Sequence, residues 1–83
     1  MSLRLVYFAA VRERIGRPSE EVETSAATPR QLLAELAARE PRYEAAFADL
    51  AALRVALDQE LSDWDAPLAG VREMAVFPPM TGG

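Results

Sequence analysis

Hydrophobic and polar positions alternate over residues 3–8, which predicts a β-strand. Its odd positions form one apolar face, and Phe8 lies with the even positions on the other face. Residues 9–15 suit a short helix that ends at Gly16, because glycine favours the left-handed conformation common at helix C-termini. Residues 19–24 alternate charged and less polar side chains, which predicts an exposed edge strand paired back on the first strand.

The clearest helix signal begins at Thr28. Thr28 suits the N-cap, Pro29 fits the first helical position, and Gln31 completes a capping box. The expected buried stripe of this helix consists of Leu32, Leu33, Leu36 and Ala37. The Glu40-Pro41 step ends the helix, because the residue before a proline avoids helical geometry. A second helical segment is expected from Arg42, with its apolar positions at Tyr43, Phe47 and Leu50.

The last third of the chain alternates again. Residues 53–57 predict a strand, residues 58–60 its turn, and Leu61 the start of a short return strand. Residues 73–77 predict the final strand, and Pro78-Pro79 stops its pairing because proline has no N–H to donate.

This order of elements favours an α+β fold, in which one main helix covers one face of a mixed sheet. If the first and last strands lie parallel in the middle, the architecture is a ubiquitin-like β-grasp. We expect residues 1–78 to form this domain and residues 79–83 to form a functional C-terminal tail.

Composition narrows the possible functions. The chain has 83 residues, 51% of them hydrophobic, and a net charge of -4, which argues against nucleic acid as a partner. It has no Cys and no His, so disulfides, thiol nucleophiles, the usual zinc ligands and the usual neutral-pH base are absent. We expect no cofactor or metal bound by the chain itself, and catalytic side chains in a partner. No apolar run suggests a signal peptide or a membrane span, so the cytoplasm is the expected location.

The tail is the most informative segment. Gly82 and Gly83 have no Cβ, so they fit a narrow channel and leave a terminal carbonyl open to attack. Pro78 and Pro79 favour an extended conformation that aims the tail away from the sheet. Residues 79–83 reach about 17 Å at roughly 3.4 Å per residue, enough to probe a deep pocket in another protein. The alternative is a frayed terminus without a function.

Two segments carry a resemblance to a known family. YFAAVRERIG (residues 7–16) and FPPMTGG (residues 77–83) resemble the two end motifs of the small subunit of molybdopterin synthase. Between them, matching positions are Gln59, Leu61, Asp65, Pro67, Leu68 and Glu73. The chain departs from the family at Asp58, often Asn, at residues 70–72, often Asp-Gly-Asp, and at Met80, often Val.

The resemblance implies a sulfur carrier. In this family a ubiquitin-activating-type adenylyltransferase uses ATP to adenylate the terminal carboxylate, here that of Gly83, with Gly82 beside it. Sulfur then replaces the adenylate and gives a thiocarboxylate. The large synthase subunit, expected as partner in a 2:2 heterotetramer, uses that sulfur to convert precursor Z (cyclic pyranopterin monophosphate) into molybdopterin. The carrier itself is then a non-catalytic subunit of an enzyme complex.

Several side chains are candidates for the partner interface. Phe8 and Phe77 share the sheet face opposite the core and are expected to form an exposed docking patch, unless irregular segments or a twisted sheet bury them. Two roles are open for Arg12. It either forms an ion pair with a partner or, together with Glu13, only keeps the surface of its helix solvated. Leu61 lies at the rim of the patch or is a minor core residue. The resemblance adds the tail positions Pro78, Pro79, Met80 and Thr81.

The turn region before the last strand has simpler explanations. Trp64 is interpreted as core filling, and Asp63 and Asp65 as turn formers instead of metal ligands.

Other functions share the same tail chemistry. One is a sulfur carrier for thiamin, cysteine or tRNA thiolation, and another is a ubiquitin-like protein modifier. A third is a plain β-grasp interaction module with an inert tail.

Overall fold

The computed structural model describes residues 1–79. The elements in chain order are β1 (Ser2–Tyr7), α1 (Ala9–Ile15), β2 (Ser19–Glu23), α2 (Pro29–Arg39), α3 (Pro41–Ala46), the 3-10 turn η1 (Leu50–Ala52), β3 (Arg54–Leu57), β4 (Glu60–Ser62) and β5 (Glu73–Phe77).

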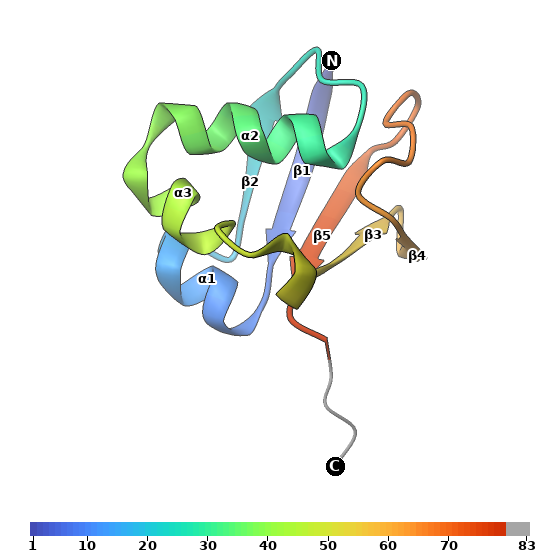
Figure 1. Ribbon diagram of the computed structural model, residues 1–83. Coiled ribbons are helices and arrows are strands. Elements are labelled where there is room, and N and C mark those ends of the chain that lie inside the picture. The colour runs from blue at the N-terminus through green and yellow to red at the C-terminus, as the bar shows by residue number, and fades with distance from the viewer. Residues whose placement is uncertain (80–83) are drawn as a thin grey trace.

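The strands form one mixed sheet in the order β2-β1-β5-β3-β4 (Figure 1). The central strands β1 and β5 run parallel, with Leu5 opposite Met74 and Tyr7 opposite Val76. All other neighbours are antiparallel, and β2 is an edge strand paired back on β1. The predicted β-grasp, including its central parallel pair, is confirmed.

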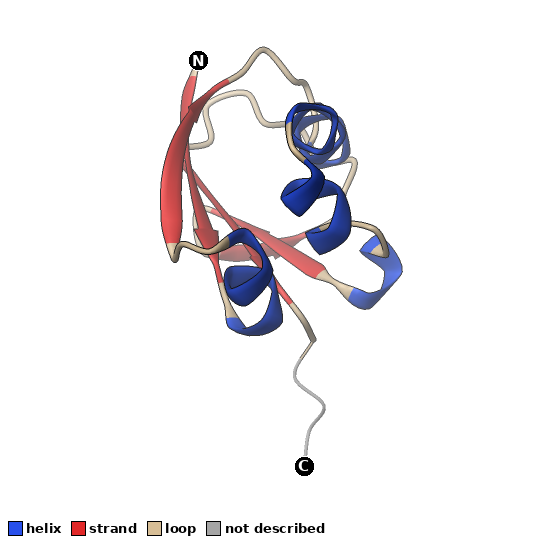
Figure 2. Cartoon of the chain, turned by 90° about the vertical axis from the view of Figure 1, so that its left-hand side faces the viewer, coloured by secondary structure: helices blue, strands red, loops and turns tan. Residues whose placement is uncertain are grey.

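The core lies between the sheet and the helices, which gather on one side of it (Figure 2). Leu5, Met74 and Val76 from the central strands are fully buried, and Leu32 and Leu36 of α2 pack over them. Burying a side chain of this size stabilises the fold by about 1.5–3 kcal/mol. Trp64 is half-buried against this core, which agrees with its interpretation as core filling.

Helix α2 begins with the expected cap, with one difference. The hydroxyl of Thr28 accepts a hydrogen bond from the Gln31 N–H at 3.2 Å, and Pro29 occupies the first turn. The Gln31 side chain reaches back to the N–H of Ala27, at 3.0 Å, instead of the N–H of Thr28. The cap therefore also fixes the approach of the loop to the helix.

The second helical segment is shorter than the sequence predicts. Helix α3 ends at Ala46, and Phe47 caps it while remaining buried. Leu50 belongs to the separate turn η1, so a single helix from Arg42 to Leu50 was wrong. The strand predicted over residues 53–57 is one residue shorter in the structure, because the pairing of β3 begins at Arg54.

Two glycines with positive φ lie at turns, one at the end of α1 and one before the last strand. Gly16 ends α1 with a φ of 92°, as glycine at a helix C-terminus permits. Gly70 has a φ of 80°, and the Val71 N–H donates to the carbonyl of Leu68 at 3.0 Å, which closes the turn before β5.

No helix within residues 1–79 is long and apolar enough to cross a bilayer.

Candidate functional site

The sheet face that the helices leave uncovered carries a continuous apolar row. Strand register places Val6 beside Ala75, Ala75 beside Ala56, and Ala56 beside Leu61. The row therefore crosses the sheet from β1 to β4. Leu61 is 71% exposed, which removes the alternative that it is a core residue.

Two aromatic rings extend this row toward the C-terminal end of β5. Phe8 and Phe77 are packed edge to face, with ring centroids 6.4 Å apart and an interplanar angle of 87°. This arrangement is favourable because the ring edge of one aromatic meets the electron-rich face of the other. Phe8 is 47% exposed and Phe77 is half-buried, so the two rings present apolar area to solvent. We call Val6, Phe8, Ala56, Leu61, Ala75 and Phe77 the open-face patch.

The chain leaves the sheet beside these rings. The Phe8 N–H donates to the carbonyl of Val76 at 3.3 Å, so the parallel pairing of β1 and β5 continues to this level. Pro78 is half-buried and Pro79 is exposed, directly beyond the end of β5. The tail positions assigned from sequence to partner binding and sulfur transfer, Met80, Thr81, Gly82 and Gly83, lie outside the described residues.

Arg12 lies on α1, and its N–H donates to the carbonyl of Phe8 at 3.3 Å. Its side chain is exposed, and none of the ion pairs within residues 1–79 includes it, with Glu13 or with any other acid. Arg12 and Glu13 are both exposed, which is compatible with either role predicted for Arg12, an ion pair with a partner or a solvated helix surface.

A row of charged side chains borders the open-face patch near the start of β5. Register aligns Glu21, Arg4 and Glu73 across β2, β1 and β5. The adjacent Asp58 carboxylate accepts hydrogen bonds from the backbone N–H groups of Arg72 and Glu73, each at 3.0 Å. Asp58 thus ties the β3–β4 hairpin to the start of β5, and the altered glycine position in residues 70–72 leaves the strand entry intact.

Two tyrosines with raised pKa values lie in a cluster on the covered side. The hydroxyls of Tyr7 and Tyr43 both donate to the same oxygen, Oε2 of Glu20, at 2.7 Å. Burial raises the pKa of Tyr7, and the hydrogen bond to Glu20 raises it further. The pKa of Tyr43 is raised by the same two causes in the same order. These tyrosines stay protonated and join β1, β2 and α3, so the cluster is structural.

No group of three potential metal ligands occurs in the part of the chain that the structure describes. Asp63 accepts the Asp65 N–H at 2.8 Å, as expected for a turn former, and Asp65 forms a two-point ion pair with Arg30. Both aspartates thus have structural partners, in agreement with their interpretation as turn formers.

Part of this surface was not predicted from the sequence. The alternation placed Val6 with Phe8 and Ala75 with Phe77, but small residues such as Ala56 carry no signal of exposure. Their joining into one row with Leu61 depends on strand register, which local periodicity does not contain. The Glu20 cluster was missed for the same reason, since its members are far apart in sequence.

Comparison with known proteins identifies the family. The model of the ThiS family matches residues 5–83. The chain belongs to the ThiS family. It is 37% identical over 81 residues to the molybdopterin synthase sulfur carrier subunit of Escherichia coli (strain K12), a match that covers 98% of this chain and 99% of that protein. The resemblance found in residues 7–16 and 77–83 is thereby confirmed.

Solved structures with the same fold extend this result. SAMP1 from Haloferax volcanii is 25% identical, with a TM-score of 0.78 and full coverage of both chains. A chain from the complex of subunits 1 and 2 of molybdopterin-converting factor from Helicobacter pylori 26695 is 22% identical, with a TM-score of 0.64 and full coverage of both chains. ThiS-family membership and the β-grasp fold therefore agree.

Proposed function

We propose that this ThiS-family chain is the sulfur carrier subunit of a molybdopterin synthase. The observation that carries the proposal is the match to the Escherichia coli carrier subunit over 98% of this chain, and the ThiS-family match extends to the Gly-Gly end at residue 83. The open-face patch supports it, because exposed clustered apolar area beside the exit of the chain is suited to a partner that encloses the tail.

The proposed chemistry takes place at the carboxylate of Gly83. A carboxylate is a poor electrophile, so an adenylyltransferase of the ubiquitin-activating type first joins it to AMP, releasing pyrophosphate from ATP. A sulfur nucleophile then attacks the carbonyl carbon, AMP leaves with the bonding electrons, and a thiocarboxylate remains. The absence of a β-carbon in Gly82 and Gly83 keeps this carbon accessible in a narrow active site.

The sulfur is then transferred in the large subunit of the synthase. Pro78 and Pro79 aim the tail away from the sheet, and the docked carrier holds the thiocarboxylate at a high effective concentration near precursor Z. Catalytic side chains belong to the large subunit, and the carrier contributes Phe8, Arg12, Leu61 and Phe77 to the interface. A 2:2 complex in the cytoplasm is the proposed setting.

A second candidate is a protein modifier that joins its C-terminus to target amines. The structural likeness to SAMP1 from Haloferax volcanii, at 25% identity, supports this candidate, because a structure of the H. volcanii small archaeal modifier protein 1 also has this fold, with a TM-score of 0.74. The products differ: a sulfur carrier returns to its free carboxylate, whereas a modifier remains as an amide on a target protein.

The test is reconstitution with the activating enzyme, ATP, a sulfide source and the large subunit. Intact mass is expected to show a gain of one sulfur for one oxygen at Gly83, and molybdopterin is expected to form from precursor Z. The matched control lacks Gly83. Full molybdopterin synthesis by that shortened chain would contradict the proposal, and stable adducts on other proteins without thiocarboxylate would favour the modifier.

A further inference from the structure

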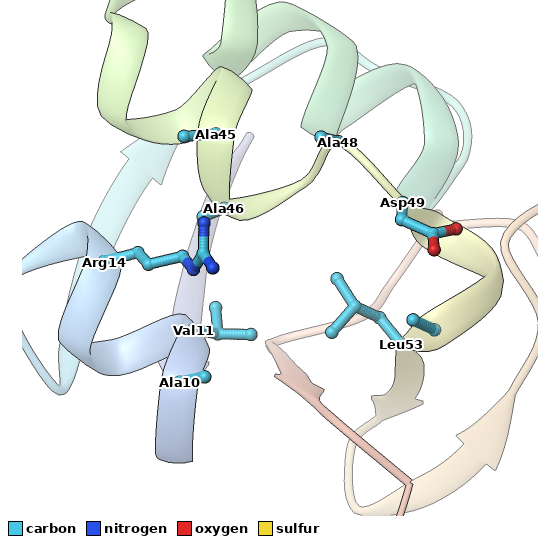
Figure 3. A pocket seen from close by; sticks show the side chains of 9 residues that line it. Ala10, Val11, Arg14, Ala45, Ala46, Ala48, Asp49 and Leu53 are labelled. Carbon is cyan, nitrogen blue, oxygen red and sulfur yellow. The ribbon is translucent and has the colours of Figure 1, made fainter.

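A shallow groove lies between α1, α3 and the segment of residues 48–53 (Figure 3). Its floor is formed by Val11 of α1, Ala46 of α3 and Leu53, each almost fully buried within the chain. Exposed alanines form its walls: Ala10, Ala45, Ala48 and Ala52. The volume is about 260 Å³. Since water takes about 30 Å³ per molecule, an apolar occupant returns several water molecules to bulk solvent.

The two rims of the groove carry opposite charges. Figure 3 shows the guanidinium of Arg14 turned from α1 toward Ala46. None of the ion pairs among residues 1–79 uses Arg14, so its charge is available to an incoming carboxylate. On the opposite rim the Asp49 carboxylate points away from Arg14. This arrangement favours an acidic group at the α1 rim and disfavours one at the other rim, which gives the occupant a direction.

The two helices beside the groove, α1 and α3, are joined by a hydrogen bond. Nη1 of Arg42, at the start of α3, donates to the carbonyl of Ile15 at the end of α1, at 3.1 Å. This bond satisfies a carbonyl that the helix end leaves without an intrahelical partner. This bond and the contact between α1 and α3 position the α1 and α3 sides of the groove relative to one another, which reduces the ordering that binding there requires.

The groove is adjacent to the place where the chain leaves the sheet. Arg54 pairs with Phe77, so the preceding Leu53 lies at the level of Pro78. Ala10 lies two residues after Phe8, whose N–H donates to the carbonyl of Val76, so this side of the groove begins beside β1, on the other side of β5 from β3. A protein that encloses the tail beyond Pro79 thus meets the open-face patch on one side and the groove on the other.

We propose that this groove is a second docking site for the large subunit, resting on the function proposed above. It receives one aliphatic side chain of that subunit, and a carboxylate next to that side chain pairs with Arg14. The open-face patch supplies apolar area on one side of the tail, and the groove fixes the rotation of the carrier about the tail.

The test measures the Kd of the carrier for the large subunit by calorimetry. Ala52→Leu places a bulky side chain in the groove from an exposed position and is expected to weaken binding about tenfold. Its control is Ala34→Leu, an exposed alanine of α2 outside the groove, with unchanged binding expected. Arg14→Glu is expected to weaken binding by a similar factor, more at low salt, whereas Arg39→Glu makes the same charge change outside the groove and is expected to have little effect.

The outcomes separate this proposal from the function. Thermal unfolding of each variant checks that the fold is retained, and Phe77→Ala reports on the open-face patch. If Phe77→Ala weakens binding while Ala52→Leu and Arg14→Glu do not, the groove proposal is wrong and the carrier function stands. If the groove variants impair only adenylation by the activating enzyme, the groove belongs to that enzyme and the assignment to the large subunit is overturned. If the wild type does not bind the large subunit, both are wrong.

Discussion

The side chains on the two faces of β5 differ in burial. Met74 and Val76 are fully buried, whereas Ala75 and Phe77, one position away, remain partly exposed on the open face. Phe77 keeps this position because it packs against Phe8 and because no helix covers that side. A side chain that stays in contact with water and gains burial only in a complex contributes more to binding than to folding.

This difference predicts the effect of Phe77→Ala. We expect the variant to weaken binding of the large subunit by at least about 1 kcal/mol, while the melting temperature changes little. The matched control is Phe47→Ala, which removes a ring buried in the core and is expected to destabilise the fold by about 3–5 kcal/mol. A large drop in melting temperature for Phe77→Ala with unchanged affinity would assign Phe77 to the core.

Backbone strain at single residues gives a second prediction. The two-residue turn between β3 and β4 has positive φ at both positions, 50° at Asp58 and 72° at Gln59, a geometry that favours glycine. Asp58 binds two backbone N–H groups, so Gln59 is the position free to change. Gln59→Gly is expected to raise the free energy of unfolding by up to about 1 kcal/mol, measured by urea denaturation.

The control for this turn is a glycine placed where no positive φ is needed. Ala34→Gly in the exposed face of α2 is expected to lower stability by about 1 kcal/mol. Equal losses in both variants would show that the turn is not strained.

At the scale of elements, an ion pair holds the loop before β5 to helix α2. Nε and Nη2 of Arg30 donate to the two carboxylate oxygens of Asp65 at 2.9 and 3.1 Å, and the Arg30 N–H donates to the carbonyl of Trp64. Hydrogen bonding to Arg30 lowers the pKa of Asp65 below its ordinary value of 3.8. The pair is fully exposed, so its contribution to stability is small.

The direction of this pKa shift predicts a pH dependence. A carboxylate whose folded-state pKa is lowered contributes stability above its unfolded pKa, and loses that contribution as pH falls through the folded value. The wild type is therefore expected to be more stable than Asp65→Asn at neutral pH, and the difference is expected to vanish well below pH 3.8. Urea midpoints across this range measure it. A difference that persists after Asp65 is protonated would assign the effect to something other than the charge.

At the scale of the whole molecule, the parallel central pair separates the two ends of the chain. Because β1 and β5 run in the same direction, Met1 lies at one end of the sheet and the end of β5 at the other (Figure 1). The open-face patch and the groove lie near the end of β5, whereas the charged row lies farther along the sheet toward Met1. Both proposed docking surfaces therefore lie at the end of the sheet opposite Met1.

This polarity predicts unequal tolerance to extension of the chain. A short tag added before Met1 is expected to leave sulfur transfer intact, because that end is remote from the docking surfaces. One residue added after Gly83 is expected to abolish transfer, because the reacting carbonyl is then displaced by about 3.4 Å from the active site. Thiocarboxylate formation and molybdopterin synthesis are measured for both. Activity in the C-terminally extended chain would contradict a terminal reacting group.

Most of the fold was predictable from local signals. The alternation of residues 3–8 and 73–77, the cap at Thr28 and the stop at Pro78-Pro79 each specify an element through interactions between near neighbours. The failure at α3 has a physical cause: the spacing of Phe47 and Leu50 fits a helix, but both also pack as separate segments after Ala46. Tertiary packing there overrides the periodic pattern.

The sequence by itself determined the family and the order of most elements, because the motifs in residues 7–16 and 77–83 and the local alternation of the strands lie within short segments. Only the tertiary structure decided which side chains come together beside the end of β5. Strand register joined Val6, Ala56 and Leu61 into one row with the aromatic pair, and the packing of α1 against α3 formed the groove beside Arg14. Both surfaces are built from contacts between residues distant in sequence, and such contacts are set by the packing of the whole domain.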